Sequence, residues 1–347
     1  MILYLAVAFF PFLVSYLNIK HTKKSKLLCI IISALPMFFL IALRAPSLGA
    51  DTGGYLREFS EIVDMPWGRL FDNTREEHGF RIFVKLVTYL THSPLIYQII
   101  CTLIYFIGIV SFANNLDFDA SWFLFFFATL GIYTFMFTGV RQCLAMSICL
   151  FSYKFIKKRK LIPFLICVAL AFTLHKSAVL FLFSYFIYSR KLHIVNILIY
   201  IVIAILAALY LETIQNFFNE QLEYDYTIEE TGNGWIFFAF LLVLTVFSTF
   251  LVVNNNKLDK ASTGLFNVGV IAIICWFLRI FTRVAERPSF YFLFFSCALM
   301  GYSMTVVKNK RDRRIIQVIV ILICSAYYAY RFATSLSTLV PYQFYFI

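Results

Sequence analysis

Residues 94–113 read PLIYQIICTLIYFIGIVSFA, a run of 20 residues that contains no Lys, Arg, Asp or Glu. A helix of about 20 mostly apolar residues is long enough to cross the hydrocarbon core of a bilayer. The whole chain has the same character, since 61% of its 347 residues are hydrophobic and only 14% are charged. Soluble proteins average about 25% charged residues. The composition therefore predicts an integral membrane protein and excludes disordered, coiled-coil and secreted classes.

Twelve apolar runs lie between charged or turn-rich breaks. They predict an all-α, polytopic membrane protein with about 12 transmembrane helices. The fifth to seventh runs adjoin one another, so ten to fourteen spans fit the pattern. Neither an internal repeat nor a low-complexity linker occurs, and residues 1–347 are predicted to form a single polytopic membrane domain. The runs cover residues 2–19, 27–43, 94–113, 121–138, 140–156, 161–174, 177–189, 194–211, 235–253, 263–280, 289–307 and 315–331.

Membrane orientation accounts for the net charge of +12. With twelve spans, alternate loops place 18 of the 30 Lys and Arg residues on one side, with four of the 18 acidic residues. Because cytoplasmic loops carry an excess of Lys and Arg, this side is predicted to face the cytoplasm. The opposite side is nearly neutral, and both termini are predicted to lie there. The charge offers no support for nucleic-acid binding.

Cysteine and histidine positions indicate neither a disulfide framework nor a metal site. The eight Cys residues all fall within predicted spans, and no CxxC, HxxxH or HExxH pattern occurs. No metal or other cofactor is therefore predicted. The first apolar run lacks a basic n-region and a small-residue cleavage site, which favours a retained span over a signal peptide.

Two outward segments, at about 44–93 and 212–234, are longer than simple connections need to be. Loops of more than about 12–15 residues are usually functional or disordered. In the first, Gly49, Gly53 and Gly54 are expected to break structure before a short amphipathic stretch, and FRIFVKLVTYL is expected to lie at the membrane interface. The second segment is acidic and is as consistent with a solvated lid as with a substrate contact.

Arginines at the outer ends of spans are the most informative charges, because they work against the positive-inside bias. Arg279, Arg283 and Arg287 follow one another at intervals of four, so on one helix they would line a single face. Arginine binds phosphate oxygens in pairs while it stays charged, which suits a pyrophosphate. The alternative is that each arginine reaches to lipid headgroups or pairs with an acid such as Glu286. The other outward arginines are Arg44, Arg141 and Arg331.

Candidate acid–base residues occur at three places along the chain. His175 ends the sixth run and is a candidate general base, although a lone histidine at a helix end is often only a hydrogen-bonded interface residue. Asp51 and Thr52 are equally well explained as a helix N-cap. Glu76 and Glu77 are either site residues or merely solvated.

Several short motifs occur in order along the chain. An Arg precedes a G-x-D-T-x-x-Y segment, an RQ opens a span and a His follows about 34 residues later. The stretches that contain these and further motifs are LRAPSLGADTGGY, EEHGF, FTGVRQCLAMSICL, KKRKLIPFLICVALAFTLHKSA, RVAERPSFYF and VPYQFYF. In this combination the chain resembles the EpsG family of bacterial polysaccharide polymerases, which includes many Wzy O-antigen polymerases. The resemblance covers most of the chain, but residues 185–262 carry no family motif.

The resemblance implies a membrane glycosyltransferase of the bacterial inner membrane, compatible with a GT-C-like arrangement. It would join oligosaccharide repeat units on undecaprenyl pyrophosphate at the periplasmic face, with no cofactor. A chain-length regulator protein is a further partner that the sequence leaves open. The implied catalytic residues are His175, Asp51 and Glu77. The positions implied to bind the pyrophosphate or the glycan are Arg44, Tyr55, Arg141, Gln142, Arg279, Arg283 and Arg287, with Thr52 and Gly79 also matching motifs.

Other functions compete with polymerisation. A flippase of lipid-linked oligosaccharide would need polar groups near the midplane and on both faces of a cavity, whereas the charges here gather at one face. An O-antigen ligase needs the same pyrophosphate site, and only the family resemblance favours a polymerase. A purely structural subunit would not need outward arginines on four spans.

Overall fold

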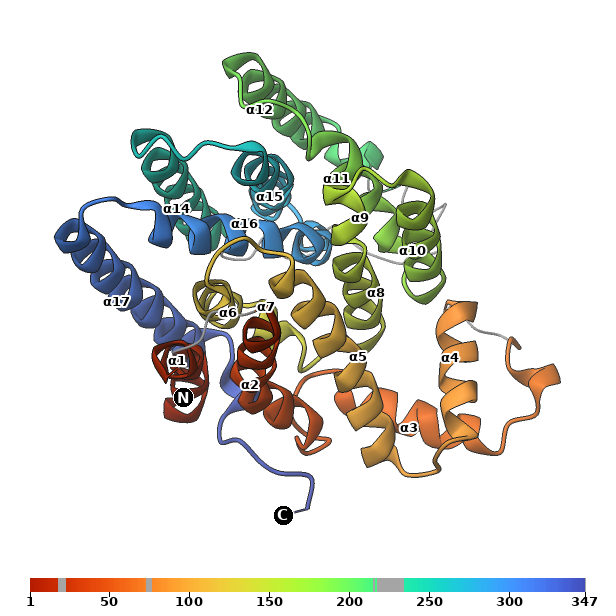
Figure 1. Ribbon diagram of the computed structural model, residues 1–347. Coiled ribbons are helices and arrows are strands. Elements are labelled where there is room, and N and C mark those ends of the chain that lie inside the picture. The colour runs from red at the N-terminus through yellow and green to blue at the C-terminus, as the bar shows by residue number, and fades with distance from the viewer. Residues whose placement is uncertain (18–22, 73–76, 215, 217–233, 347) are drawn as a thin grey trace. The chain divides into compact units, whose positions relative to one another are not determined.

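The chain is folded almost entirely into helices (Figure 1). The computed structural model describes residues 1–17, 23–72, 77–214, 216 and 234–346. Among these residues the only β-type pairing is an isolated antiparallel bridge between Arg44 and Phe344. The predicted all-α class is confirmed.

Among the described residues, six helices are long and apolar enough to cross a membrane, so the protein is a multi-pass membrane protein. Every predicted run contains at least one helix, but several helices are short and the count of 12 spans stays a prediction. The fourth run is broken into two helices at Gly131, whose φ of +97° suits glycine. A side chain at Gly131 would also collide with the Arg331 guanidinium. The six long segments are Ser25–Ala42, Pro94–Asn114, Gly234–Asn254, Lys260–Leu278, Arg283–Val306 and Lys310–Thr334.

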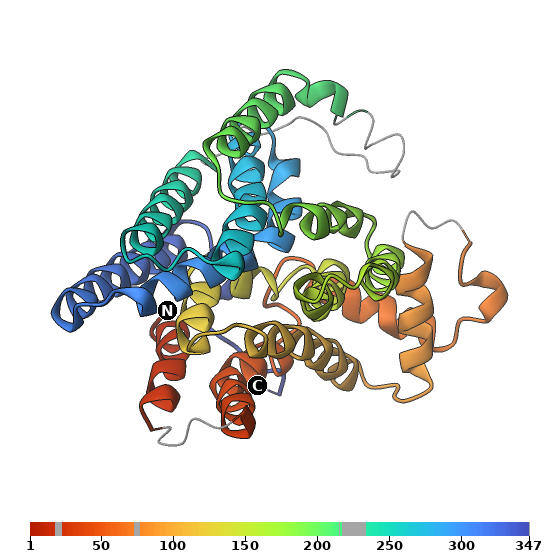
Figure 2. The same ribbon diagram turned by 45° about the horizontal axis from the view of Figure 1, so that its top comes forward.

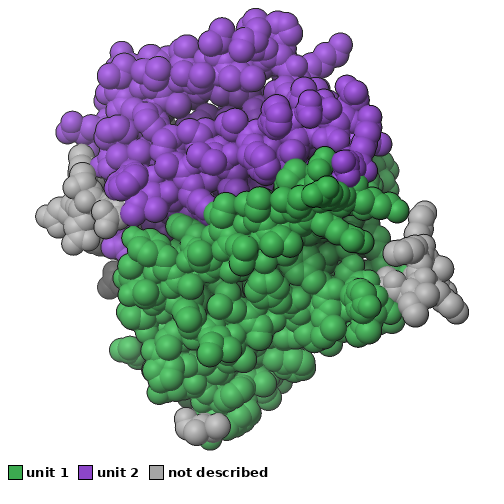
Figure 3. Space-filling view, turned by 90° about the vertical axis from the view of Figure 1, so that its left-hand side faces the viewer, with its two compact units in different colours: residues 1–179, 310–347 green, residues 180–309 purple. Residues whose placement is uncertain are grey.

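The helices form two compact units, coloured separately in Figure 3. Unit 1 comprises residues 1–179 and 310–347, and unit 2 comprises residues 180–309. The expectation of one polytopic domain stays a prediction. Unit 1 contains α1 (Ile2–Leu17), α2 (Lys23–Ala42), α3 (Thr52–Val63), η1 (Trp67–Arg69), α4 (His78–Thr88), α5 (Pro94–Asn114), α6 (Ala120–Thr129), α7 (Ile132–Phe135), α8 (Val140–Phe151), α9 (Tyr153–Lys157), α10 (Leu161–Leu174), α17 (Lys310–Thr334) and η4 (Ser337–Leu339). Unit 2 contains α11 (Leu182–Ile187), α12 (Ile194–Leu209), α14 (Gly234–Asn254), α15 (Lys260–Leu278), η3 (Arg283–Ala285) and α16 (Glu286–Val306), while η2 (Lys176–Phe181) joins the two.

Unit 1 is organised around α5, which packs against α2 on one side and α8 on the other. Gly108 brings α5 close to α8, since a Cβ there would lie 2.5 Å from the Ser147 carbonyl oxygen. In the segment between α2 and α5, which is predicted to face outward, the described residues form α3, η1 and α4, and α3 packs against α4 (Figures 1 and 2). The expected break at Gly53 and Gly54 is wrong, because both lie in the first turn of α3. FRIFVKLVTYL does form a helix, α4.

The C-terminal tail, residues 340–346, returns to the end of α2. The Ala45 amide donates to the Gln343 carbonyl at 2.9 Å, and the Tyr345 amide donates to the Leu43 carbonyl at 2.8 Å. The Tyr342 hydroxyl donates to the Leu40 carbonyl at 3.0 Å. The closing VPYQFYF stretch therefore holds the segment that leads into α3.

Unit 2 is built on α15 and α16, which pack along much of their length, with α14 beside both. Asp259 and Ser262 form a capping box at the start of α15. Farther along the helix, the buried Asn267 side chain donates to the Ile187 and Arg190 carbonyls at 3.2 and 2.7 Å. Asn267 thus fixes the C-terminal end of α11 against α15.

Candidate active site around Glu77

The candidate site in unit 1 begins with the tight turn before α3. Gly49 has a φ of +90°, and a Cβ there would lie 2.0 Å from the Phe137 carbonyl oxygen. Only glycine fits this position without strain. The close approach lets the Thr52 hydroxyl donate to the same carbonyl at 2.7 Å. The turn thereby anchors the first residues of α3 to the segment that leads into α8.

Arg44 lies buried beneath this turn. Its side chain is almost fully enclosed, with 1% of the residue exposed. The guanidinium donates to the Ile41 carbonyl at 2.6 Å and to the Thr52 hydroxyl at 3.3 Å. An arginine that satisfies a carbonyl at a helix C-terminus stabilises that end. This geometry favours a positioning role for Arg44, and substrate binding by it stays a prediction.

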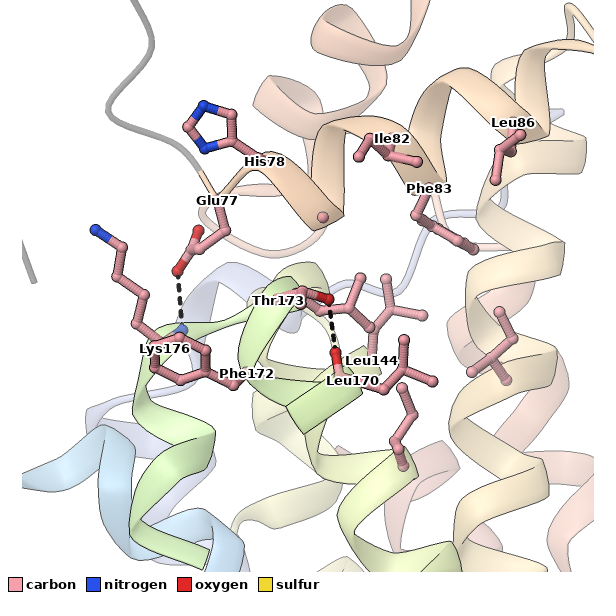
Figure 4. A pocket seen from close by; sticks show the side chains of 14 residues that line it. Glu77, His78, Ile82, Phe83, Leu86, Leu144, Leu170, Phe172, Thr173 and Lys176 are labelled. Carbon is pink, nitrogen blue, oxygen red and sulfur yellow. Dashed lines mark hydrogen bonds between the residues drawn. The ribbon is translucent and has the colours of Figure 1, made fainter. Parts of the chain in front are cut away.

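Glu77 stands at the centre of the site and joins the side chains of His175 and Arg141. One carboxylate oxygen lies 3.1 Å from His175 Nδ1, and the other accepts from Arg141 Nη1 at 3.1 Å. The Lys176 amide also donates to this carboxylate, at 3.3 Å (Figure 4). The side chains of Glu77 and His175 are 5% and 10% exposed. The expectation that Glu77 is merely solvated is wrong, while Glu76 lies outside the described residues.

Three helix ends bring these residues together. Glu77 is the N-cap residue of α4, His175 is the C-cap residue of α10, and Arg141 is the second residue of α8. A carboxylate at a helix N-terminus also gains from the helix dipole. The site therefore collects functional groups from segments that are far apart in sequence.

Arg141 is held by aromatic groups as well as by Glu77. Its Nε donates to the Tyr55 hydroxyl at 3.4 Å, and the guanidinium carbon lies 5.7 Å from the ring centroids of both Tyr55 and Phe80. Cation–π contacts of this kind hold a guanidinium plane in place. Tyr55, from α3, thereby joins the cluster.

The electrostatic balance keeps Glu77 ionised. Burial by itself raises the pKa of this carboxyl, but the hydrogen bond and charge of His175 and the charge of Arg141 outweigh it. The net effect lowers the pKa of Glu77 from 4.5 to about 2. Glu77 is therefore a carboxylate at neutral pH, which suits an orienting anion better than a proton donor.

Gly79 allows α4 to approach α10 near the charged cluster. A Cβ at Gly79 would lie 2.5 Å from Thr173, which is too close for any larger residue without movement. The glycine of the EEHGF motif therefore has a packing reason, and it fixes Glu77 beside His175.

A cavity of about 640 Å³ opens next to the cluster, between α4, α5, α8 and α10 (Figure 4). Its walls are apolar side chains. Glu77, His78 and Lys176 lie together at one end. Lys176 was not among the site residues predicted from the sequence, and only its position directly after His175 could have pointed to it.

Two other predicted site residues, Asp51 and Gln142, lie at the starts of α3 and α8. Asp51 occupies the N-cap position of α3 as expected, but its side chain makes no capping bond. Among the described residues, Asp51 has no hydrogen bond or ion pair with Glu77, Arg141 or His175. Gln142 follows Arg141 in α8 and is buried, with 2% exposed.

The arginine segment lies in unit 2, and its expected helical stripe is wrong. Arg279 is the C-cap residue of α15, Arg283 begins η3, and Arg287 lies in the first turn of α16. The chain leaves the helix after Leu278, and the Thr282 side chain then caps η3. Arg279 pairs with Glu286 at 3.0 Å, as the alternative interpretation anticipated.

No group of three or more His, Cys, Asp or Glu side chains with metal-binding geometry occurs in the described part of the chain. The eight cysteines are free thiols.

Comparison with known proteins supports the family resemblance. The EpsG family model matches residues 26–344, nearly the whole chain. No curated protein and no solved structure matches the chain significantly.

Proposed function

Because this chain belongs to the EpsG family, a family of polysaccharide-polymerase type, we propose that it joins oligosaccharide repeat units carried on undecaprenyl pyrophosphate. The reaction takes place at the periplasmic face of the bacterial inner membrane. It moves the growing glycan from its lipid carrier onto a new lipid-linked repeat, and the product is an O-antigen or an exopolysaccharide.

The observation that carries the proposal is the bridge from Glu77 to both His175 and Arg141, each at 3.1 Å. A glycosyl pyrophosphate already contains its leaving group, so the enzyme has to supply a base for the attacking hydroxyl and positive charge for the departing pyrophosphate. His175 and Arg141 are groups of these two kinds, and one carboxylate holds both.

In the proposed step, a hydroxyl oxygen of the acceptor repeat forms a bond to the anomeric carbon of the donor glycan. The bond between that carbon and the pyrophosphate oxygen breaks, and its electron pair leaves with undecaprenyl pyrophosphate. His175 takes the hydroxyl proton. Because Nδ1 of His175 faces the Glu77 carboxylate, the neutral ring carries its proton on Nδ1 and accepts at Nε2. Glu77 also stabilises the imidazolium that forms.

Arg141 is assigned to the pyrophosphate. A guanidinium has five N–H donors, so it can hold Tyr55 and Glu77 and still donate to phosphate oxygens. The assignments of Arg279, Arg283 and Arg287 to the same pyrophosphate, and of Asp51, Tyr55 and Gln142 to the substrates, stay predictions. In this proposal Arg44 and Thr52 position the turn before α3.

The test is the surface polysaccharide of a deletion strain, separated on a gel. The proposal expects the glycan of the deletion strain to stop at a single repeat. The wild-type gene should restore the ladder of gel bands from longer chains, and a His175→Ala variant expressed at the same level should not. A ladder that persists in the deletion strain would overturn the proposal. Lipid-linked repeats trapped on the cytoplasmic leaflet would indicate a flippase, and polymer that is made but not attached would indicate a ligase.

A further inference from the structure

The cavity beside Glu77 combines two surfaces that one ligand could use together. Its walls come from the apolar faces of α4, α8 and α10, including Phe83, Ile148 and Leu170. Its charged end holds Glu77 and Lys176. In Figure 4 the α4 side chains Ile82, Phe83 and Leu86 lie along one wall, with Leu144 and Leu170 facing them.

The walls of the cavity are open to the surroundings of unit 1. Leu86 and Leu170 are each 54% exposed, and Phe172 is 39% exposed. Apolar side chains exposed to this extent in a multi-pass membrane protein are suited to contact with hydrocarbon. We therefore expect a lipid chain to reach the cavity from the membrane.

The charged end distinguishes this cavity from an ordinary lipid-facing crevice. The side chain of Arg141 and the ring of His175 are both bonded to Glu77, and Lys176 follows directly. Arg141 and Lys176 bring a guanidinium and an ammonium group to this end of the cavity, and both kinds of group bind phosphate oxygens. An anionic head is therefore expected to fit this end while its chain lies along the apolar walls.

We propose that the cavity between α4 and α10 binds the polyprenyl chain of the lipid-linked substrate and places its pyrophosphate beside Arg141 and Lys176. This inference rests on the proposed function. It adds the position of the chain, and it makes Lys176 a headgroup contact. The closeness of Gly79 to Thr173 fixes the two helices at the charged end, so the chain extends away from that contact along α4.

The experiment uses the purified full-length protein in nanodiscs and an undecaprenyl phosphate probe with a photoreactive group near the far end of its chain. Crosslinked peptides are identified by mass spectrometry. The proposal expects crosslinks on the cavity-lining parts of α4, α8 and α10, and competition by unlabelled undecaprenyl phosphate but not by phosphatidylglycerol. Crosslinks spread evenly over exposed apolar helices, or equal competition by phosphatidylglycerol, would show bulk lipid only and overturn it.

A matched pair of variants tests the walls. Leu170→Trp fills the cavity, whereas Ile166→Trp adds the same bulk to an exposed position on α10 that does not line it. Leu170→Trp is expected to weaken probe binding by about tenfold, which corresponds to 1.4 kcal/mol, and Ile166→Trp to leave it unchanged. Equal effects of the two variants would contradict the assignment.

The crosslinking readout does not depend on polymerisation, so the two proposals can fail separately. Specific crosslinking in a protein whose deletion leaves the polysaccharide ladder intact would remove the polymerase function and keep the lipid site. Loss of the ladder in the deletion strain without specific crosslinking would keep the polymerase and remove the lipid site.

Discussion

Glu77 is the residue on which the site depends. Its carboxylate bonds to both His175 and Arg141, and its low pKa means that it orients and stabilises instead of transferring the proton itself. In the proposed mechanism His175 is therefore the base.

Glu77→Gln tests this role directly. The amide keeps the size of the side chain and removes the charge that fixes the His175 tautomer. Polymer formation by purified protein is expected to fall by about 10²–10⁴-fold, the usual contribution of general acid–base catalysis. Glu61→Gln, at an exposed position on α3, is the control and is expected to keep full activity. A Glu77→Gln enzyme as active as the control would contradict the assignment.

The pH dependence of stability follows from the same carboxyl. A folded-state pKa of about 2, below the ordinary 4.5, stabilises the folded protein above pH 4.5, and this stabilisation is lost as the pH falls toward 2. The melting temperature of the wild type in detergent should therefore exceed that of Glu77→Gln above pH 4.5, and the difference should shrink on acidification. A difference that grows on acidification would contradict the depressed pKa.

At the scale of elements, short helices and tight turns build the site, and the long apolar helices support it. The turn at Gly49, the start of α3 and the start of α8 are linked through the Phe137 carbonyl. Positions 49 and 79 require glycine because a Cβ at either would lie 2.5 Å or less from a neighbouring atom. The family motifs therefore mix residues for chemistry with residues for close packing.

The C-terminal tail is expected to be part of this support. A chain truncated after Val340 loses the backbone bonds from Ala45 to Gln343 and from Tyr345 to Leu43, and the bond from Tyr342 to Leu40. Three hydrogen bonds contribute about 3 kcal/mol at about 1 kcal/mol each. The truncated protein is expected to melt at a lower temperature in detergent.

Gln343→Ala is the matched control for the truncation. It keeps the backbone bond to Ala45 and removes only the side-chain bond between Gln343 and the Ser47 hydroxyl. Its melting temperature is expected to stay close to that of the wild type. If the truncated chain melts at the wild-type temperature, the tail does not hold the segment before α3.

At the scale of the whole molecule, the distribution of charge predicts which way the chain runs through the membrane. Both termini are expected to face outward and the loop at 154–160 inward. Alkaline phosphatase fused to the C-terminus should therefore be active, while a fusion within 154–160 should be inactive. Active enzyme at 154–160 would overturn the predicted orientation. An inactive C-terminal fusion beside an outward N-terminus would overturn the even number of spans.

The sequence by itself determined the all-α membrane class, the approximate positions of the long apolar helices and the family. These follow from hydropathy and short motifs, which are local properties of the sequence. The predicted run at 94–113, for example, matches α5 almost residue for residue. The residues of the candidate site, too, were nearly all named from motifs.

Only the tertiary structure decided how those residues are used. Arg141 lies 64 positions from Glu77, and Lys176 lies 99 positions from it, so their contacts depend on how α4, α8 and α10 pack. The sequence could not reveal that Glu77 is buried between His175 and Arg141, or that Arg44 is enclosed beneath the turn before α3. The prediction that Arg279, Arg283 and Arg287 share one helix was wrong for a related reason. A spacing of four residues does not show where a helix ends. Packing between distant segments and the ends of helices are set by the whole fold, and local pattern does not encode them.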